Sequence, residues 1–270
     1  MSLRVDLADD VCRCRLRGGL FLSTGFDGGV READAAYNVT VPDGWGDAGV
    51  RDLRSYVDER LSDAGFPTDP AAPALLTGVA QRHARVARLD GVAVVATAGL
   101  SNPAALPVDV DASRADFDAA PADSEDAAET ETKATDDSPH RPPGTVNLVV
   151  GTNRELAPGA LANLVAIVAE AKAATLLATT GFPGTTSDAI VVATDPSGEH
   201  ARFSGAATRL GAATRTCVRD ATLGSLGSRY SDGDATIPDA VDDADHGIVT
   251  DERSVVSRVA PPTDADDTDP

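Results

Sequence analysis

GTVNLVVGTN, residues 144–153, opens the stretch that decides how this chain folds. An alanine-rich run follows at residues 158–180, then GTTSDAIVVAT at residues 184–194 and FSGAATRLG at residues 203–211. A short apolar strand on each side of one long helix is typical of a layered α/β protein. Polar side chains interrupt the apolar pattern at several places, so this stretch is also where we look for chemistry.

Two polar residues of this stretch are expected at buried positions. Strand alternation places Asn147 on one face of its strand, which predicts a buried or half-buried amide that needs partners. At 100° per residue, Lys172 shares a helix face with the apolar stripe, whereas Glu170 lies on the opposite face. Lys172 either extends to water along a buried stem or serves a site as a partly desolvated ammonium.

Outside this stretch, the sequence predicts further strands and helices. His83 is expected on the polar side of its helix, and Gly18-Gly19 is expected as the turn between the first two strands. The expected fold class is α/β, a single layered domain with a mixed β-sheet and packed helices, and a sandwich of two sheets between helical layers is the alternative. The expected strands are residues 12–16, 20–24, 36–41 and 91–100, and the expected helices are residues 50–64 and 74–85.

The acidity of the chain is concentrated in two segments. Residues 108–139 hold 11 acidic side chains and residues 231–270 hold 12, which leaves 20 acidic and 19 basic side chains elsewhere. Low periodicity and abundant Ala, Ser, Thr and Pro predict a disordered insertion at residues 104–143. The tail from residue 231 is expected to be mostly disordered, with one short strand at residues 254–259. The folded domain is then residues 1–230, interrupted by the insertion at residues 104–143.

Composition narrows the possible partners and the compartment. A net charge of −20 disfavours nucleic acid or an anionic membrane as a partner, and oligomeric state is not readable. Only Lys133 and Lys172 are lysines beside 21 arginines, a bias that suggests a salt-adapted, halophilic cytoplasm. No positively charged, apolar signal sequence opens the chain, and the apolar run at residues 157–180 carries charges. We therefore expect a soluble, cytoplasmic protein.

The cysteines and histidines predict no metal site. Cys12 and Cys14 alternate along an expected strand and are interpreted as small buried residues, and with Cys217 they make no disulfide framework. The four histidines are scattered along the chain. This scatter disfavours a zinc site or a histidine-based catalytic triad.

Residues 184–188, Gly-Thr-Thr-Ser-Asp, place three hydroxyl groups and a carboxylate before an apolar strand. The pattern fits a turn in which Ser187 or Asp188 caps free backbone groups. It also fits a hydroxyl nucleophile or a water-positioning group beside a base. The lysine signature of a phosphate-binding loop and the glycine fingerprint of a dinucleotide site are both missing from the sequence.

Several motifs, taken together and in order, match one known family. They are Thr97-Ala-Gly-Leu-Ser-Asn-Pro103, Gly144-Thr-Val-Asn-Leu148, Ala169-Glu-Ala-Lys172, Gly184-Thr-Thr-Ser-Asp-Ala-Ile-Val-Val-Ala193 and Phe203-Ser-Gly-Ala-Ala-Thr-Arg-Leu-Gly211, with fainter support from Asp27-Gly-Gly29 and Tyr37-Asn-Val39. From about Cys14 to Leu226, the chain resembles the adenosylcobinamide amidohydrolase family of corrinoid salvage. The family often has Gly-Thr-Gly-Thr-Asp where this chain has Gly-Thr-Thr-Ser-Asp, so Asp188 is kept, and a histidine role does not transfer.

The resemblance implies hydrolysis of the amide that joins a propionyl side chain of the corrin ring to aminopropanol, giving adenosylcobyric acid and 1-amino-2-propanol. The corrinoid with its cobalt is then the substrate, and no cofactor is expected. For this reaction, Asp188 is expected to be the base, acting on water or on the hydroxyl of Thr185, Thr186 or Ser187. Lys172 is expected at the oxyanion or in proton transfer, with Glu170 as its partner or as an alternative acid. The expected substrate-binding residues are Asn147, Asn153, Ser101, Asn102, Asp27, Gly28, Gly29, Asn38 and Thr208.

Two other functions are compatible with parts of the sequence. A corrinoid-binding or carrier protein would keep the same pocket without hydrolysis. An interaction protein that acts through its acidic tails fits the charge but leaves the central motifs unexplained.

Overall fold

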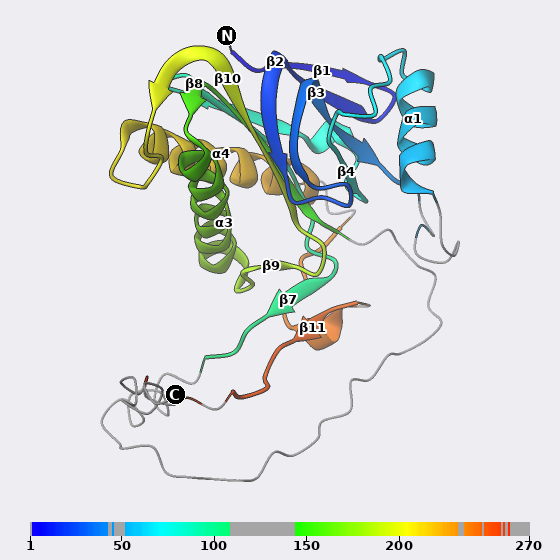
Figure 1. Cartoon of the computed structure of the whole chain (residues 1–270). Coiled ribbons are helices and arrows are strands. Elements are labelled where there is room, and N and C mark those ends of the chain that lie inside the picture. Colours follow the sequence, from blue (N-terminus) through cyan, green and yellow to red (C-terminus); the bar gives the residue numbers. More distant parts are fainter. Residues whose placement is uncertain are drawn as a thin grey trace, which may run out of the picture. The chain divides into compact units, whose positions relative to one another are not determined.

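The structure is a computed structural model that describes residues 2–42, 45, 52–108, 144–231, 235–244, 246–254, 256 and 259 (Figure 1). The chain divides into two units, and the first contains the described residues up to Ala105 and from Gly144 to Val249. The second contains the described residues from Leu106 to Val108 and from Thr250 onward, and these form no helix or strand. Residues 109–143 of the expected insertion lie outside the described residues.

One eight-stranded sheet forms the centre of the first unit. Its order is β4-β3-β2-β10-β8-β6-β5, and β1 pairs with β2 off this path. The pairs β8–β10 and β3–β4 are parallel, whereas the other pairs are antiparallel, so the expected mixed sheet is confirmed. The strands are β1 (Arg4–Ala8), β2 (Val11–Ser23), β3 (Gly29–Thr40), β4 (Ala74–Thr77), β5 (Arg85–Leu89), β6 (Val92–Ala98), β8 (Val146–Leu156) and β10 (Ala189–Ala201).

The three described α-helices begin and end where local chemistry favours it. The side chain of Asp52 caps the first helix by accepting hydrogen bonds from two backbone N–H groups, and Thr208 caps the last helix in the same way through one. Pro158 occupies the first turn of the long helix, where no amide donor is needed, and Gly181 ends it with a φ of 81°. The helices are α1 (Leu53–Asp63), α3 (Pro158–Thr180) and α4 (Arg209–Tyr230).

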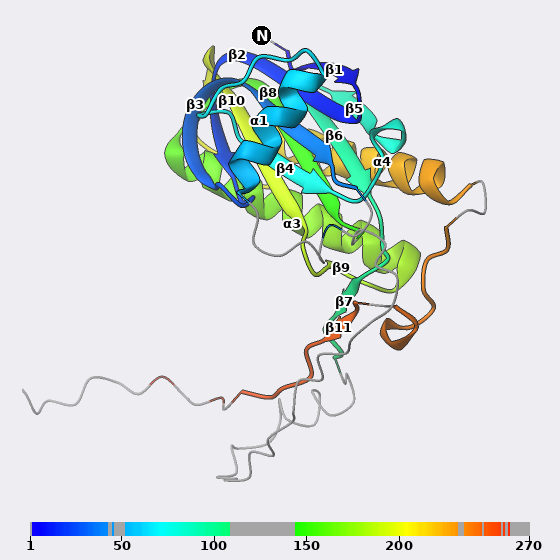
Figure 2. The same ribbon diagram turned by 90° about the vertical axis from the view of Figure 1, so that its right-hand side faces the viewer.

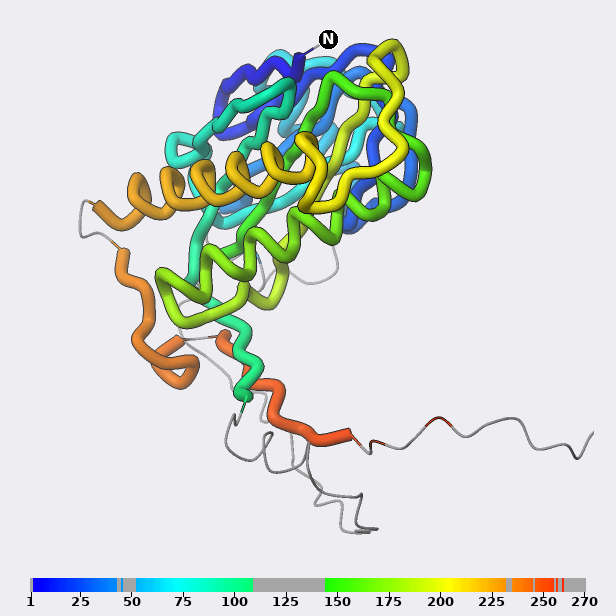
Figure 3. Tube along the Cα trace, turned by 90° about the vertical axis from the view of Figure 1, so that its left-hand side faces the viewer, coloured from blue at the N-terminus to red at the C-terminus, as the bar shows by residue number. Residues whose placement is uncertain are grey.

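The two faces of the sheet have separate cores. Figure 3 shows α3 and α4 side by side over one face, and Figure 2 shows α1 on the other side, over the end that carries β3 and β4. Val94 and Leu148 belong to the core beneath α3 and α4, whereas Val95 and Val149, one residue further along each strand, belong to the core that includes Val57 of α1. Strand alternation therefore supplies both cores from the same strands.

Helix α3 is long and apolar enough to cross a membrane by length and composition. In the structure, its buried residues Leu161, Leu164 and Val168 pack in one core with β6, β8, β10 and α4. This is the arrangement of a core helix in a layered protein.

The sheet curls so that β3 and β4 approach β6 and β8 across the second core. The Asn147 side chain donates to Asn38 Oδ1 and to the carbonyl oxygen of Leu76, both at 2.9 Å. Asn38 in turn donates to Thr97 Oγ1 at 2.9 Å. Asn38 and Asn147 are each 1% exposed, so the expected burial of Asn147 is confirmed. Two strand layers thus face one another, as in the alternative two-sheet sandwich, but both layers belong to one continuous sheet.

The first unit also contains a second, three-stranded sheet. Its order is β11-β7-β9, with β9 antiparallel and β11 parallel to β7. β11 and the short 3-10 helix η3 (Val241–Asp243) come from the segment expected to be a tail, so part of that segment is ordered against the domain. The strands are β7 (Pro103–Ala105), β9 (Gly184–Thr185) and β11 (Ile248–Val249).

The helix expected at residues 74–85 is wrong. These residues form β4, a turn and the 3-10 helix η2 (Gln81–His83), followed by the start of β5. The apolar residues of β4 extend the sheet by pairing with the parallel strand β3. The strand partner is distant in sequence, so helical spacing over a short apolar run does not decide its structure.

His83 is buried, contrary to the expectation of a polar helix face. It is 9% exposed, and its Nδ1 lies 3.1 Å from Ser228 Oγ on α4. Burial lowers the pKa of His83, and the positive charges of Arg82, Arg229 and Arg85 lower it further.

The two strands expected at residues 12–16 and 20–24 form one strand, β2. Gly18 adopts a φ of 59°, and its backbone N–H donates to Asp34 Oδ1 on β3 at 2.7 Å. The register between β2 and β3 shifts at this point. The Gly18-Gly19 pair therefore bends a continuous strand instead of reversing the chain.

Two smaller expectations have opposite outcomes. Cys12 and Cys14 are buried, as expected. Within the segment expected to form a strand at residues 254–259, Ser254, Val256 and Val259 are described, and none of them lies in a strand.

We predict that Asn147→Ala destabilises the fold by about 1–3 kcal/mol, because Asn38 Oδ1 and the Leu76 carbonyl would lose a buried donor. Chemical denaturation of the purified protein measures the change. Asn153→Ala is the matched control, since this amide lies on the same strand but is exposed. Equal stability of the two variants would contradict a structural role for the buried amides.

Candidate active site

Several chain segments that are distant in sequence meet at one edge of the large sheet. β8 starts at Val146 and β10 starts at Ala189, beside the end of β6 at Ala98. The short strands β7 and β9 leave the sheet from this edge and pair with one another (Figure 1). This arrangement brings together three of the motifs singled out in the sequence, at residues 97–103, 144–148 and 184–193.

The Asp188 carboxylate is the centre of the site. Its Oδ1 accepts hydrogen bonds from the backbone N–H of Val146 at 2.8 Å and from the hydroxyl of Thr185. Its Oδ2 accepts hydrogen bonds from the backbone N–H of Thr185 at 3.1 Å and from Lys172 Nζ. Four donors from three segments therefore fix one carboxylate, in the way that a buried charge requires.

Lys172 reaches Asp188 from the sheet-facing side of α3. As the helical phase predicts, it shares that side with the buried Leu161 and Val168. The side chains of Lys172 and Asp188 are 12% and 10% exposed. Of the two interpretations of Lys172, the structure has the partly desolvated ammonium in an ion pair.

Gly184 makes room for this ion pair. A Cβ atom at this position would come within 2.8 Å of Lys172 Nζ and closer still to the Asp188 carboxylate. The glycine lies in β9, where pairing with Ala104 of β7 fixes its backbone. Any side chain at residue 184 would therefore push against the ammonium or the carboxylate.

The loop after β6 packs against the same hydroxyl-rich turn. The Asn102 side chain donates to Thr186 Oγ1, and the backbone N–H of Thr186 donates to the Asn102 carbonyl oxygen at 3.2 Å. Ser101 Oγ accepts a hydrogen bond from the backbone N–H of Gly144 at 2.6 Å. The structure thus joins Ser101, Asn102 and Thr186 to the Asp188 cluster.

Two buried amide oxygens at this end of the sheet accept no hydrogen bond from any described residue. They are Oδ1 of Asn102 and Oδ1 of Asn147, and each residue is 1% exposed. Buried polar atoms of this kind are rare because each costs free energy. Both amides therefore keep unused acceptor capacity inside this end of the sheet.

Three of the expected site residues lie apart from this cluster, and a fourth stands in its turn with no described side-chain contact. Glu170 is on the outer side of α3, 59% exposed, and pairs with Arg215 of α4. Asn153 and Thr208 lie at the opposite end of the sheet, where Asn153 N–H donates to the Gly91 carbonyl and Thr208 caps α4. Ser187 is exposed, and no hydrogen bond of its side chain is described.

The Asp27-Gly28-Gly29 turn borders the same edge as Asp188. The backbone N–H of Thr24, three residues before Asp27, donates to the carbonyl oxygen of Ile190 at 2.9 Å. Asp27 itself is held by the guanidinium groups of Arg31 and Arg54. Its carboxylate is thus engaged in the structure of the turn.

Two residues that were not among the expected site residues also shape this edge. Thr97 belongs to the apolar strand β6, and its hydroxyl accepts from Asn38 in the buried amide chain. Tyr230, the last residue of α4, accepts a hydrogen bond from the backbone N–H of Leu100 at 2.8 Å and so supports the loop after β6. Thr97 opens one of the family motifs and is a single hydroxyl in an apolar strand, whereas no local pattern indicates Tyr230.

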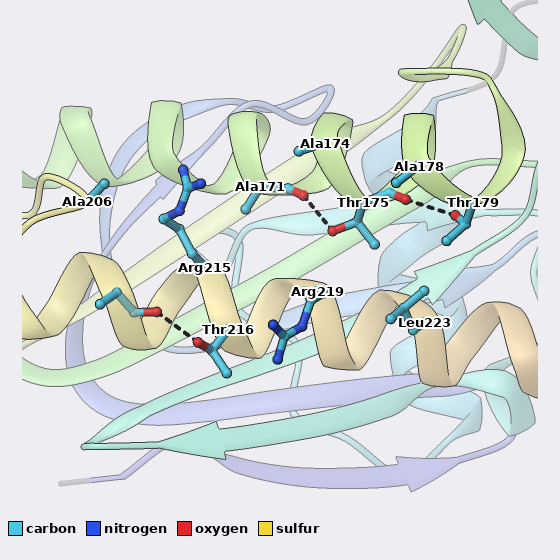
Figure 4. Close-up of a pocket in the computed structure, with 11 residues that line it drawn as sticks. Ala171, Ala174, Thr175, Ala178, Thr179, Ala206, Arg215, Thr216, Arg219 and Leu223 are labelled. Carbon is cyan, nitrogen blue, oxygen red and sulfur yellow. Dashed lines mark hydrogen bonds between the residues drawn. The ribbon is translucent and has the colours of Figure 1, made fainter.

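A surface groove of about 480 Å³ runs between α3 and α4 (Figure 4). Its walls carry small side chains such as Ala174 and Ala178, with Arg215 and Arg219 along one side. Of the expected catalytic residues, none lines this groove. Among the described residues, no group of three or more His, Cys, Asp and Glu side chains could hold a metal ion.

Comparisons with known proteins agree with the motifs. The family model described as "Adenosylcobinamide amidohydrolase" matches residues 11–234. A protein named adenosylcobinamide amidohydrolase from Halobacterium salinarum is 52% identical over 252 residues, which cover 93% of this chain and 97% of that protein. The crystal structure of the PH0078 protein from Pyrococcus horikoshii OT3 covers 83% of this chain and 78% of its own, with 12% identity and a TM-score of 0.37. That last likeness supports no conclusion about fold or function.

We predict that Gly184→Ala lowers turnover about tenfold or more and lowers the midpoint of thermal unfolding, because the added methyl group displaces the buried ion pair. Gly159→Ala in the first turn of α3 is the matched control, since a Cβ there meets no atom within 4 Å. Turnover and the midpoint of thermal unfolding are measured for both. Full activity of Gly184→Ala would show that the ion-pair geometry does not matter for the reaction.

Proposed function

This chain belongs to the adenosylcobinamide amidohydrolase family and is an amidohydrolase, and we propose from that premise that adenosylcobinamide is its substrate. The proposed reaction cleaves the amide between the corrin propionyl group and aminopropanol. Its products are adenosylcobyric acid and 1-amino-2-propanol. The corrinoid product would then return to coenzyme synthesis, which makes this a salvage reaction in the cytoplasm.

The observation that carries a hydrolytic function is the Thr185–Asp188–Lys172 unit. A hydroxyl donates to a carboxylate, and the same carboxylate holds an ammonium in a largely desolvated position. Amide hydrolysis needs a nucleophile beside a base and a positive charge near the developing oxyanion. These three side chains supply all of these groups, and a binding module would require none of them in this arrangement.

In the proposed first step, Thr185 Oγ1 attacks the amide carbonyl carbon while its proton passes to Asp188 Oδ1. Lys172 stabilises the negative oxygen of the tetrahedral intermediate through an N–H that does not face Asp188. Asp188 then gives the proton to the amide nitrogen as the carbon–nitrogen bond breaks and aminopropanol leaves. Water attacks the resulting ester of Thr185, with Asp188 again taking the proton and returning it to Oγ1.

Substrate positioning falls to the neighbouring amides. The unpartnered Oδ1 atoms of Asn102 and Asn147 are proposed acceptors for donors of the substrate, which include the scissile N–H and the hydroxyl of aminopropanol. Asn102 is the more directly placed of the two because it also bonds Thr186 in the turn before Asp188. An acceptor aimed at the scissile N–H would orient the amide plane for attack.

We predict that Asp188→Asn lowers aminopropanol release by about a hundredfold or more, because an amide cannot take the proton of the nucleophile. Released aminopropanol is measured by mass spectrometry in high-salt buffer, and corrinoid binding is followed separately by visible absorbance. Asp220→Asn is the control, since Asp220 is an exposed residue of α4 paired with Arg219. Near-native turnover of Asp188→Asn would remove Asp188 from the mechanism, and wild-type binding without aminopropanol release would favour a carrier protein.

The role of Thr185 is tested by pairing two substitutions. Thr185→Ser keeps a hydroxyl and is expected to retain measurable turnover, whereas Thr185→Val removes the nucleophile at nearly constant volume and is expected to abolish it. A covalent adduct of wild type, with the mass of the corrinoid acyl group, is expected by intact-protein mass spectrometry after rapid quenching. Substantial activity of Thr185→Val would show instead that Asp188 activates water directly.

A further inference from the structure

The turn between β2 and β3 presents an exposed aromatic ring at the edge that carries the site. Phe26 is 40% exposed, although it is one of only 10 aromatic side chains in the chain. Two hydrogen bonds tie its turn to the start of β10, from Thr24 N–H to the Ile190 carbonyl at 2.9 Å and from Ile190 N–H to Thr24 Oγ1 at 3.0 Å. Ile190 is two residues after Asp188, so the turn that carries Phe26 lies beside the chain segment that carries the carboxylate.

The turn is rigidly constructed around this ring. A Cβ at Gly25 would come within 2.7 Å of the Leu75 side chain, and a Cβ at Gly28 would come within 2.8 Å of the Ser23 carbonyl oxygen. Both glycines therefore allow a close approach that other residues could not make. The packing fixes the conformation in which Phe26 is displayed.

Charged groups support the ring from behind. Asp27 accepts hydrogen bonds from Arg31 and from Arg54 Nη2, and Arg54 also donates to the Ala72 carbonyl at 3.3 Å. This places the Arg54 guanidinium 5.6 Å from the centroid of Phe26, within the range of a cation–π contact. Asp27, which the sequence motif emphasised, thus positions the platform, and Phe26 is the residue left open to a ligand.

We propose that Phe26 is the stacking platform for the adenine of the substrate's upper axial ligand and so makes the enzyme prefer the adenosyl form. This inference rests on the proposed function, because it assumes that the substrate is adenosylcobinamide. Adenine offers a flat π face that stacks on an aromatic side chain, whereas the corrin ring is crowded by its own amide side chains. The scissile amide would lie at Asp188 while the adenine lies over the neighbouring turn.

The test compares adenosylcobinamide with cobinamide that carries cyanide in place of the adenosyl group. Equilibrium binding is measured by the visible absorbance of the corrinoid, so the readout does not depend on turnover. Wild type is expected to bind the adenosyl form about tenfold or more tightly than the cyanide form. Phe26→Ala and Phe26→Leu should remove that preference by weakening only the adenosyl form, and Phe26→Tyr should restore it.

The chain offers a closely matched control. Phe203 is 68% exposed, and the Arg202 guanidinium lies 5.6 Å from its ring, but it follows β10 at the end opposite the site. Phe203→Ala should therefore leave binding of both corrinoids unchanged. The thermal midpoint of each variant shows whether it is folded.

Other outcomes would overturn the inference. Equal weakening of both corrinoids by Phe26→Ala would mean that the ring contacts the corrin, and no weakening would mean that it contacts neither part. Aminopropanol release with an unaltered adenosyl preference in Phe26→Ala would refute the platform but not the proposed function. An adenosyl preference that depends on Phe26, without aminopropanol release by wild type, would refute the proposed function but support the platform.

Discussion

The contact between Lys172 and Asp188 is the interaction on which the arrangement of the site depends. One carboxylate receives an ammonium from α3, a backbone N–H from the start of β8, and a hydroxyl and an N–H from β9. Without these partners, burying the two charges would be strongly unfavourable. Helix α3, the large sheet and the three-stranded sheet therefore meet at this carboxylate. A shift of any of them would change the hydrogen bonds of Asp188.

The parts of this arrangement that the sequence predicted are those set by a local period. A 3.6-residue period places Lys172 toward the core and Glu170 toward solvent, and a two-residue period buries Asn147. Periodicity cannot say which distant strand meets a buried amide. The Asn38–Asn147 contact joins residues 109 apart in sequence and exists only because the sheet curls. For the same reason, the apolar spacing of residues 74–85 predicts a helix, although pairing with the distant strand β3 makes residues 74–77 a strand.

Motif membership predicted the candidate site only in part. Asn102, Thr185 and Asp188 come from two separate motifs, and the structure places them together at one end of the sheet. Asn153 and Thr208 stand in equally suggestive motifs but lie at the other end of the strands. A strand of 11 residues, the length of β8, spans about 35 Å. Residues at its two ends are therefore too far apart to belong to one site, whatever motif each belongs to. Strand direction and order are non-local and were not readable.

The low exposure of the Lys172–Asp188 pair determines how strongly concentrated salt would screen it. At 1 M salt, the Debye length is about 3 Å, so attractions between exposed charges are largely cancelled by mobile ions. A pair with side chains 10–12% exposed gives those ions little access. The Lys172–Asp188 pair is thereby shielded from the medium, whereas an exposed pair such as Glu170–Arg215 is open to screening by salt. Buried and exposed ion pairs of one small domain thus respond differently to the same salt concentration.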